Sequence, residues 1–168
     1  MAAGNNAEPR SAEQAAPRSS GRERGGKTVK SPRHRAREFA VQGLYQWLVG
    51  GQDEAAIETQ AASVPGFDKA DRELYTSLLH GVMCGEDGLR DLIAPHVSRN
   101  WEGVSPIERC ILLLATYELQ NRFDTPYRVV INEAIELAKT YGGTDGHKFV
   151  NGVLDKLVPQ LRPAETTR

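Results

Sequence analysis

Apolar residues recur every three or four positions along most of this 168-residue chain. In residues 32–50 they fall at Ala36, Ala40, Leu44 and Trp47, which is the spacing of one buried face of an α-helix. No segment alternates apolar and polar residues over the length of a strand, and the one β-branched run, residues 129–131, lies within helical spacing. The sequence therefore predicts an all-α fold.

Capping and turn residues divide this pattern into about seven helices joined by short connections. Ser31 and Pro32 suit the N-cap and first position of a helix, and residues 50–51, both Gly, suit its end. Residues 105–108, Ser-Pro-Ile-Glu, form a capping-box pattern before an apolar helix over 110–119. The other predicted helices start at Asp53, Asp68 and Thr125, with a short turn over Leu89–Ile93 and a last helix that carries Phe149 and ends before Pro159.

The charge is divided between two parts of the sequence. Residues 1–37 hold nine Lys or Arg and three Glu, a balance of +6, and the remaining 12 basic and 19 acidic residues give residues 38–168 a balance of −7. Clustered cations gain free energy by displacing counterions from phosphates, so the asymmetry indicates a polyanionic partner. The alternative is a basic tail that only keeps the chain in solution.

Composition predicts three regions. Residues 1–30 contain one β-branched aliphatic residue, Val29, and no aromatic residue, so they cannot bury enough apolar surface to offset the entropy of ordering. We expect them to form a disordered basic tail. Residues 31–162 are the predicted helical domain, and residues 163–168 the predicted flexible C-terminus.

Several functional classes find no support in the sequence. No apolar run is long enough for a membrane span or a secretory signal, and Cys84 and Cys110 form no disulfide or zinc pattern, which indicates a reducing cytoplasm. No hydrolase, metalloprotease or EF-hand motif occurs, and the loop over residues 142–148 lacks the ending and the preceding strand of a P-loop. We therefore expect neither enzymatic chemistry nor a cofactor or metal.

The first predicted helix is the most informative about binding. Arg37, Val41 and Tyr45 follow one flank of its buried face, while Arg35, Gln42 and Gln46 lie across the outer face. A guanidinium and a phenol on one flank suit single-stranded RNA, whose phosphates pair with Arg and whose unstacked bases stack on aromatic rings. Alternatively, Tyr45 packs at the edge of the core and the Arg side chains are merely solvated. Three Arg near a helix N-terminus oppose the helix dipole, which favours the functional interpretation.

Three stretches resemble the NusB family of bacterial transcription antitermination factors. They are residues 33–47 (RHRAREFAVQGLYQW), residues 126–127 together with 131–139, and residues 147–155 (HKFVNGVLD). The resemblance spans about residues 32–162 and implies two three-helix bundles with a short additional helix. It also implies a non-enzymatic role in processive antitermination on ribosomal RNA operons, in a complex with RNA polymerase. In that role the chain pairs with the small-subunit ribosomal protein NusE and binds the boxA element of nascent, single-stranded RNA.

The resemblance also implies site residues. RNA-binding positions map to Arg33, His34, Arg35, Arg37, Tyr45, Asp145, Lys148 and Phe149, and a NusE-facing position maps to Glu108.

Three positions depart from the family pattern. His34 replaces a common Arg and gives a partial, pH-dependent charge. Gly146 loosens the loop before Lys148, and Gly43 replaces Ala at a cost to the helix below about 1 kcal/mol unless close packing recovers it.

Two other functional classes stay open at this point. One is a NusB-like accessory domain of an RNA cytosine methyltransferase, which requires a downstream cofactor-binding domain. The other is a protein–protein module that uses its basic helix to form a homodimer.

Overall fold

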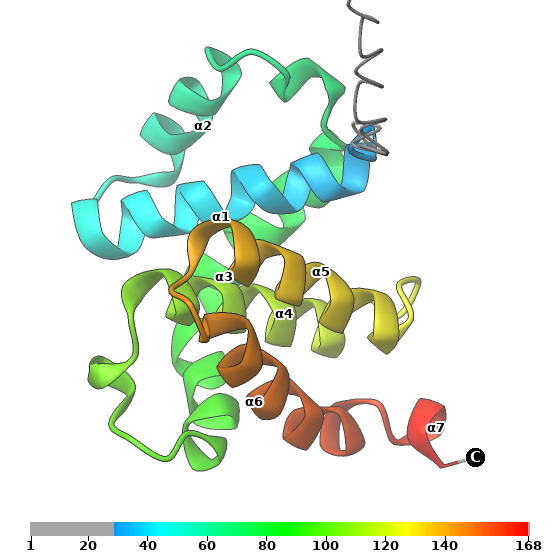
Figure 1. Cartoon of the computed structure of the whole chain (residues 1–168). Coiled ribbons are helices and arrows are strands. Elements are labelled where there is room, and N and C mark those ends of the chain that lie inside the picture. Colours follow the sequence, from blue (N-terminus) through cyan, green and yellow to red (C-terminus); the bar gives the residue numbers. More distant parts are fainter. Residues whose placement is uncertain (1–28, 168) are drawn as a thin grey trace, which may run out of the picture.

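Seven α-helices and three short 3-10 helices make up residues 29–167, the part of the chain that this computed structural model describes (Figure 1). Residues 1–28, most of the predicted disordered tail, lie outside the described residues. No strand occurs within residues 29–167, and the all-α prediction is confirmed. The helices are α1 Pro32–Gly50, α2 Glu54–Ala62, α3 Arg72–Ile93, α4 Pro106–Asn121, α5 Tyr127–Tyr141, α6 Gly146–Leu161 and α7 Pro163–Thr166, and the 3-10 helices are Phe67–Lys69, Ala94–His96 and Trp101–Gly103.

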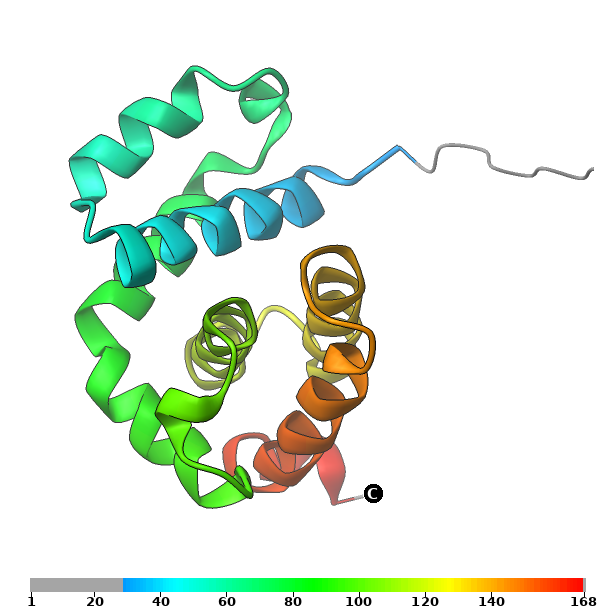
Figure 2. The same cartoon turned by 60° about the vertical axis from the view of Figure 1, so that its left-hand side comes forward.

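The helices form two groups that share α3. Helix α1 packs on α2 and on α3, whereas α4, α5 and α6 pack on one another. Helix α3 runs along the side of both groups (Figure 2). Gly43 lets α1 approach α2 closely, because a Cβ at this position would lie 2.8 Å from Cγ2 of Ile57. The predicted cost of Gly43 is therefore offset by close packing.

Helix α4 is the centre of the second group. Its residues 110–116 are all buried, and it contacts α1, α3, α5 and α6. At its C-terminus the buried guanidinium of Arg162 donates to the carbonyl oxygens of Leu119 (2.6 Å), Arg122 (2.9 Å) and Glu118 (3.2 Å). A cation placed there satisfies the free carbonyls and complements the helix dipole, so Arg162 joins the end of α6 to the end of α4.

Some predicted boundaries are wrong. The helix predicted to start at Asp68 starts at Arg72, because the Asp71 side chain caps it by accepting from the Leu74 N–H at 3.0 Å. The turn predicted at residues 89–93 is the end of this same helix, which bends at Gly85 (φ −110°, ψ 15°).

The C-terminal boundaries also differ from the prediction. Helix α6 continues past Pro159 to Leu161, since the buried bonds of Arg162 hold the chain beyond the proline. Residues 163–166, predicted to be flexible, form α7, which the Glu165 carboxylate joins to α5.

Candidate nucleic-acid interface

The first turn of α1 carries cations and no acidic residue. The Ser31 hydroxyl accepts a hydrogen bond from the His34 N–H at 3.0 Å, and Pro32 occupies the first helical position, so the local sequence defines this helix start. Free N–H groups at a helix start favour anions, and Arg33 and Arg35 add formal positive charge there. This end of α1 is therefore electropositive in its own right.

Arg33 reaches from α1 to the loop between α4 and α5. Its Nη2 donates to Oδ2 of Asp124 at 3.2 Å and to Oγ1 of Thr125 at 2.9 Å, while 39% of its side chain stays exposed. The hydrogen bond from Arg33 is the main cause that lowers the pKa of the Asp124 carboxyl. The guanidinium is thus held in one place yet remains open to solvent.

Arg35 is partly exposed on the opposite side of the same helix turn. Its Nη1 lies near Gly66, 3.3 Å from the position that a Cβ would take there. Among the described residues no carboxylate lies within 4.0 Å of its guanidinium. Its charge is therefore not neutralised by an ion pair within residues 29–167.

His34 faces α5 instead of solvent. Its Nδ1 lies 2.6 Å from Oε2 of Glu133, and its Nε2 lies 3.4 Å from Oε1 of Glu38. Both ring nitrogens are therefore engaged by carboxylates, and the structure places His34 as a bridge between α1 and α5. It offers no free ring nitrogen to an RNA strand in this arrangement.

The structure contradicts the prediction that Arg37 contacts RNA. Its side chain is 2% exposed and forms a two-pronged ion pair with Glu118 of α4, itself 1% exposed, in which Nε donates to the two carboxylate oxygens at 3.0 and 3.2 Å. Nη1 of Arg37 also lies 3.8 Å from Oε2 of Glu133. Arg37 adjoins Ala36 and Ala40 on the buried face, so the packing of α1 on α4 takes it inside. A guanidinium in this position cannot contact a phosphate.

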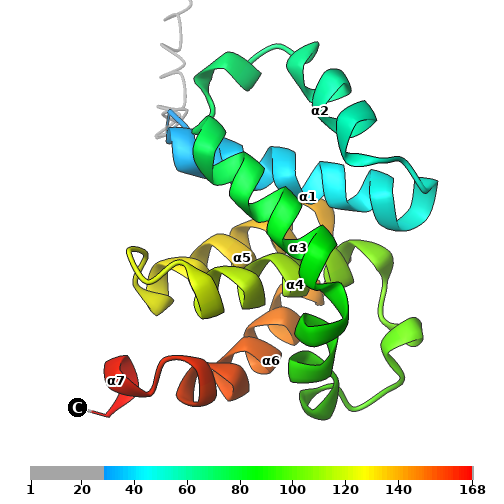
Figure 3. The same ribbon diagram turned by 180° about the vertical axis from the view of Figure 1, so that it is seen from behind.

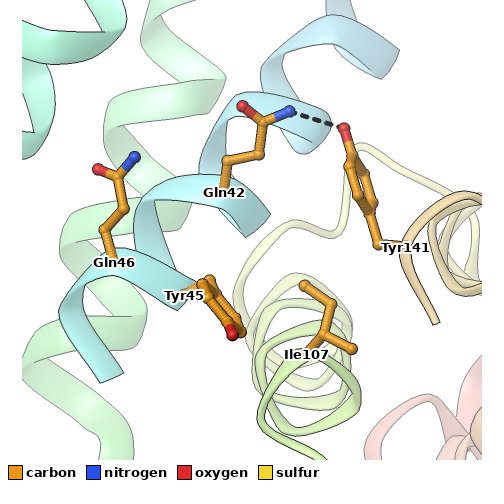
Figure 4. Close-up of a pocket in the computed structure, with 5 residues that line it drawn as sticks. All are labelled: Gln42, Tyr45, Gln46, Ile107 and Tyr141. Atoms are coloured by element: carbon orange, nitrogen blue, oxygen red, sulfur yellow. Dashed lines mark hydrogen bonds between the residues drawn. The ribbon is translucent and has the colours of Figure 1, made fainter. Parts of the chain in front are cut away.

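A hollow of about 430 Å³ opens beside Tyr45 (Figure 4). Gln42, Tyr45 and Gln46 come from α1, Ile107 from the start of α4 and Tyr141 from the end of α5. Tyr45 is 42% exposed, so it is not sealed in the core. The hollow therefore combines an accessible ring with polar amide and phenol groups.

The polar groups of this hollow form a short hydrogen-bonded chain. Nε2 of Gln42 donates to the Tyr141 hydroxyl at 2.7 Å, and that hydroxyl donates to Oε2 of Glu38 at 3.3 Å. Burial is the main cause that raises the pKa of Tyr141, so its hydroxyl keeps its proton near neutral pH. Lys30 lies at the end of this hydrogen-bonded network, where its Nζ forms an ion pair with Oε2 of Glu38 at 3.0 Å.

The start of α6 carries the second predicted group of RNA-binding residues. Asp145 and Lys148 are both exposed, and the Lys148 Nζ lies 3.5 Å from Oδ1 of Asp145. Phe149 is partly buried beneath Arg99, whose guanidinium carbon lies 5.0 Å from the ring centroid. Lys148 thus presents its ammonium group to solvent, whereas most of Phe149 is covered.

Glu108, in the first turn of α4, does not point outward. It is 9% exposed, Oε2 accepts from the Ser105 hydroxyl at 2.9 Å, and its N–H donates to Oγ of Ser105 at 3.3 Å. Its Oε1 lies 2.5 Å from where a Cβ at Gly146 would be. Gly146 therefore allows α4 to meet the start of α6, and the predicted partner-facing role of Glu108 is not supported by its exposure.

Known proteins share the sequence of this chain over most of its length. The sequence profile of the NusB family matches residues 34–159. The curated transcription antitermination protein NusB of Aromatoleum aromaticum is 59% identical over 138 residues, which are 82% of this chain and 95% of that protein. The chain belongs to the NusB family. Antitermination of transcription is the function of this family, and it is not enzymatic.

Solved structures agree with this assignment. NusB from T. maritima matches with a TM-score of 0.69 at 30% identity, over 82% of this chain and 97% of that one. A crystal structure of antitermination factors NusB and NusE in complex with dsRNA matches with a TM-score of 0.67 over 77% of this chain and 97% of that one. The second match has 23% identity and shows the NusB fold alone. The methyltransferase alternative is not favoured, since the relatives matched over nearly their whole length are NusB proteins.

Several residues of this NusB-family surface were not predicted. Ile107 and Tyr141 line the hollow from α4 and α5, and only the packing of these helices against α1 brings them to Tyr45. Gln42 did carry a signal, because it precedes Tyr45 by three residues and a helix places both on one side. Arg99 lies in the irregular segment before α4, where helical spacing gives no information.

Two features are absent from the residues that the structure describes. Within residues 29–167, no His, Cys, Asp or Glu residues gather in threes in a geometry that could hold a metal ion. None of the helices described is both long and apolar enough to span a bilayer.

Proposed function

We propose that this NusB-family protein binds the boxA element of nascent ribosomal RNA together with NusE, and thereby supports processive transcription by RNA polymerase in the cytoplasm. The observation that carries the proposal is the exposed Tyr45 ring beside the hollow lined by Gln42, Gln46, Ile107 and Tyr141. We call the five residues that line this hollow the Tyr45 surface. The exposed Lys148 at the start of α6 is a separate cation that does not line the hollow.

The chemistry of the Tyr45 surface suits single-stranded RNA. An unstacked base can place its face on the Tyr45 ring and its polar edge against the amides of Gln42 and Gln46. A paired base keeps its edge within the duplex and its faces in the stack, and it could use neither group. The proposed ligand is therefore a single strand.

The phosphate contacts come from fewer residues than the sequence predicts. Arg33, Arg35 and Lys148 each retain accessible charge, whereas Arg37 is buried against Glu118. Three phosphate contacts on single-stranded RNA give a slope of log binding constant against log salt concentration near −2, at roughly −0.7 per contact. His34 is engaged by Glu38 and Glu133 and adds nothing to this count.

We include NusE as a partner because the chain belongs to the NusB family. The solved complex with the same fold contains NusB, NusE and dsRNA, which supports a NusE partner and an RNA ligand for this chain. We assign no residue to the NusE contact, because Glu108 is turned inward to Ser105 and Gly146.

The direct test is a titration of the full-length protein with three RNAs: single-stranded boxA, a scrambled strand of equal length, and boxA annealed to its complement. Each is measured with and without NusE at one salt concentration. We expect the single-stranded boxA RNA to bind most tightly and NusE to raise its affinity. Equal affinity for all three RNAs would contradict base recognition at the Tyr45 surface.

Sedimentation of the same samples distinguishes RNA binding from the homodimer alternative. We expect boxA RNA to add its own mass to the sedimenting protein. A dimer that forms with rising protein concentration and whose mass boxA RNA leaves unchanged would instead support a self-association module.

A further inference from the structure

Helix α5 ends beside the middle of α1, as the views from opposite sides both show (Figure 1, Figure 3). Tyr141 is the last residue of α5, and its hydroxyl lies 2.7 Å from Nε2 of Gln42 on α1. The same hydroxyl lies 3.3 Å from Oε2 of Glu38, one turn earlier on α1. Gln42 and Tyr141 belong to the Tyr45 surface, and Glu38 supports them from outside it.

The charge of Glu38 sets the direction of these hydrogen bonds. A carboxylate only accepts, so the Tyr141 hydroxyl donates its single proton to Glu38. The hydroxyl then offers only lone pairs to Gln42, and it accepts from the amide nitrogen rather than facing the amide oxygen. Figure 4 shows this orientation, with the nitrogen of Gln42 toward Tyr141 and the oxygen on the other side of the amide. Of the two orientations in which nitrogen and oxygen exchange places, the network allows one.

Glu38 is itself held in place by two further groups. Nζ of Lys30 lies 3.0 Å from Oε2, and Nε2 of His34 lies 3.4 Å from Oε1, so both carboxylate oxygens are engaged. The Glu38 side chain is 12% exposed, and little water competes for it. Hydrogen bonds to an ionised group are stronger than those between neutral groups, so the network is anchored at its Glu38 end. The orientation of the Gln42 amide therefore depends on a charge that it does not touch.

The amide of Gln42 keeps two groups for a ligand. Gln42 is exposed, and within residues 29–167 its amide makes only the hydrogen bond to Tyr141, so one N–H and the oxygen stay available. An amide binds the edge of a base through such a pair, because its N–H donates to an acceptor while its oxygen accepts from a neighbouring donor. Gln42 and Tyr45 line the same hollow, three residues apart on one side of α1. A base stacked on the Tyr45 ring thus meets the donor and the acceptor in a fixed order.

The order of donor and acceptor divides the RNA bases into two classes. On their Watson–Crick edges, adenine and cytosine carry an amino donor beside a ring-nitrogen acceptor. Guanine and uracil carry a carbonyl acceptor beside a ring N–H, which is the reverse order. An amide that is free to turn over matches either class, whereas an amide fixed in one orientation matches one class and leaves the groups of the other unpaired.

We propose that Tyr141 is a positioning residue that makes the Tyr45 surface discriminate between amino bases and keto bases. It acts through Gln42, whose amide it holds in one orientation, and it contacts no base itself. The inference rests on the proposed function, since it requires an RNA base on the Tyr45 ring. It extends that function by assigning stacking to the ring and sequence discrimination to the hydrogen-bonded network.

The test is a transition scan of single-stranded boxA RNA against the full-length protein. One position at a time, A and G are exchanged for each other, as are C and U, which keeps the ring size for stacking but reverses donor and acceptor. For the wild type we expect a position at which the exchange weakens binding at least about fivefold, the discrimination that a pair of hydrogen bonds to a base edge provides. Tyr141→Phe should reduce this factor to below about twofold, and it should weaken binding of boxA itself about threefold, because the amide must now be ordered on binding.

A double variant separates positioning from direct contact. Gln42→Ala should remove the discrimination, and adding Tyr141→Phe to it should change neither the affinity nor the discrimination further, because no amide is left to orient. Tyr127→Phe is the matched control. Tyr127 starts the same helix, its hydroxyl accepts from Nε of Arg128 at 3.2 Å, and it lies outside the Tyr45 surface, so this variant should match the wild type.

The outcomes distinguish this inference from the proposed function. Equal binding of boxA, scrambled and annealed RNA by the wild type would overturn the proposed function and the inference with it. A wild type that prefers boxA but loses less than about twofold at every exchanged position would overturn the inference alone. The same holds if Tyr141→Phe keeps the discrimination of the wild type, or if its effect persists beside Gln42→Ala.

Discussion

The ion pair between Arg37 and Glu118 contributes to stability in an asymmetric way. Both side chains are almost completely buried between α1 and α4, so each charge has lost its hydration and depends on the other. An intact buried pair often contributes little, but removing one partner leaves an uncompensated charge in the interior. The same burial makes Arg37 a structural residue in a helix whose other arginines are open to solvent.

We therefore predict that Arg37→Ala lowers the free energy of unfolding by about 3–5 kcal/mol. The double replacement Arg37→Met with Glu118→Leu should recover most of this loss, because no charge then stays unpaired. Urea denaturation gives both values, and Arg35→Ala is the control, expected within roughly 0.5 kcal/mol of the wild type. If Arg37→Ala were as mild as Arg35→Ala, the burial of this pair would be refuted.

Individual residues were predictable to different degrees. The exposure of Tyr45 is one of the two alternatives that its place on the flank of the α1 stripe left open, and the structure selects it. The burial of Arg37 could not be predicted from spacing along one helix, because it depends on how α1 packs against α4. One signal existed: Glu118 lies in a helix that is apolar nearly all round, and a buried carboxylate requires a partner.

At the scale of elements, the starts of the helices were easier to predict from the sequence than their ends. The capping box at Ser105 begins α4 as the sequence predicts, because its hydrogen bonds involve only neighbouring residues. Asp68 and Asp71 are equally good caps by sequence, and only the packing of the chain after α2 selects Asp71. The continuation past Pro159 and the formation of α7 depend on Arg162, whose partners lie about 40 positions earlier.

Helix α7 supplies a cap that α5 lacks. Pro126, the N-cap of α5, makes no side-chain hydrogen bond, and Oε2 of Glu165 accepts from the Tyr127 N–H at 3.0 Å instead. This backbone hydrogen bond is the main cause that lowers the pKa of Glu165, with a further contribution from Arg162. The carboxylate therefore stabilises both the start of α5 and the attachment of α7.

We predict that Glu165→Gln is less stable than the wild type by roughly 0.5–1 kcal/mol at pH 7, because the charge at the helix start is lost. The folded pKa of Glu165 is lower than its unfolded value of 4.5, so the contribution is complete above that value and is lost as the pH falls through the folded pKa. Denaturation of both proteins from pH 7 to pH 3 should show the difference shrinking. Glu136→Gln, at an exposed i,i+3 pair with Lys139, should show almost none. A difference that persists at pH 3 would contradict this assignment.

At the scale of the whole molecule, the fold brings together what the sequence keeps apart. Tyr45, Ile107 and Tyr141 come from three helices and line one hollow because α4 contacts α1 and α5. The helical class could be predicted from spacing, and Tyr45 was a candidate RNA contact from its place on the first helix and from the family resemblance. The hollow itself could not, because it exists only between packed helices.

The most direct test of this account is the affinity of single-stranded boxA RNA for Tyr45→Ala. Stacking of one base on the ring predicts a loss of about 1–3 kcal/mol in binding free energy, with the salt slope unchanged near −2. Phe123→Ala is the control, because its ring is 66% exposed but lies in the loop after α4, away from the hollow, and its affinity should match the wild type. Equal affinities of Tyr45→Ala and the wild type would contradict the claim that this surface holds an RNA strand.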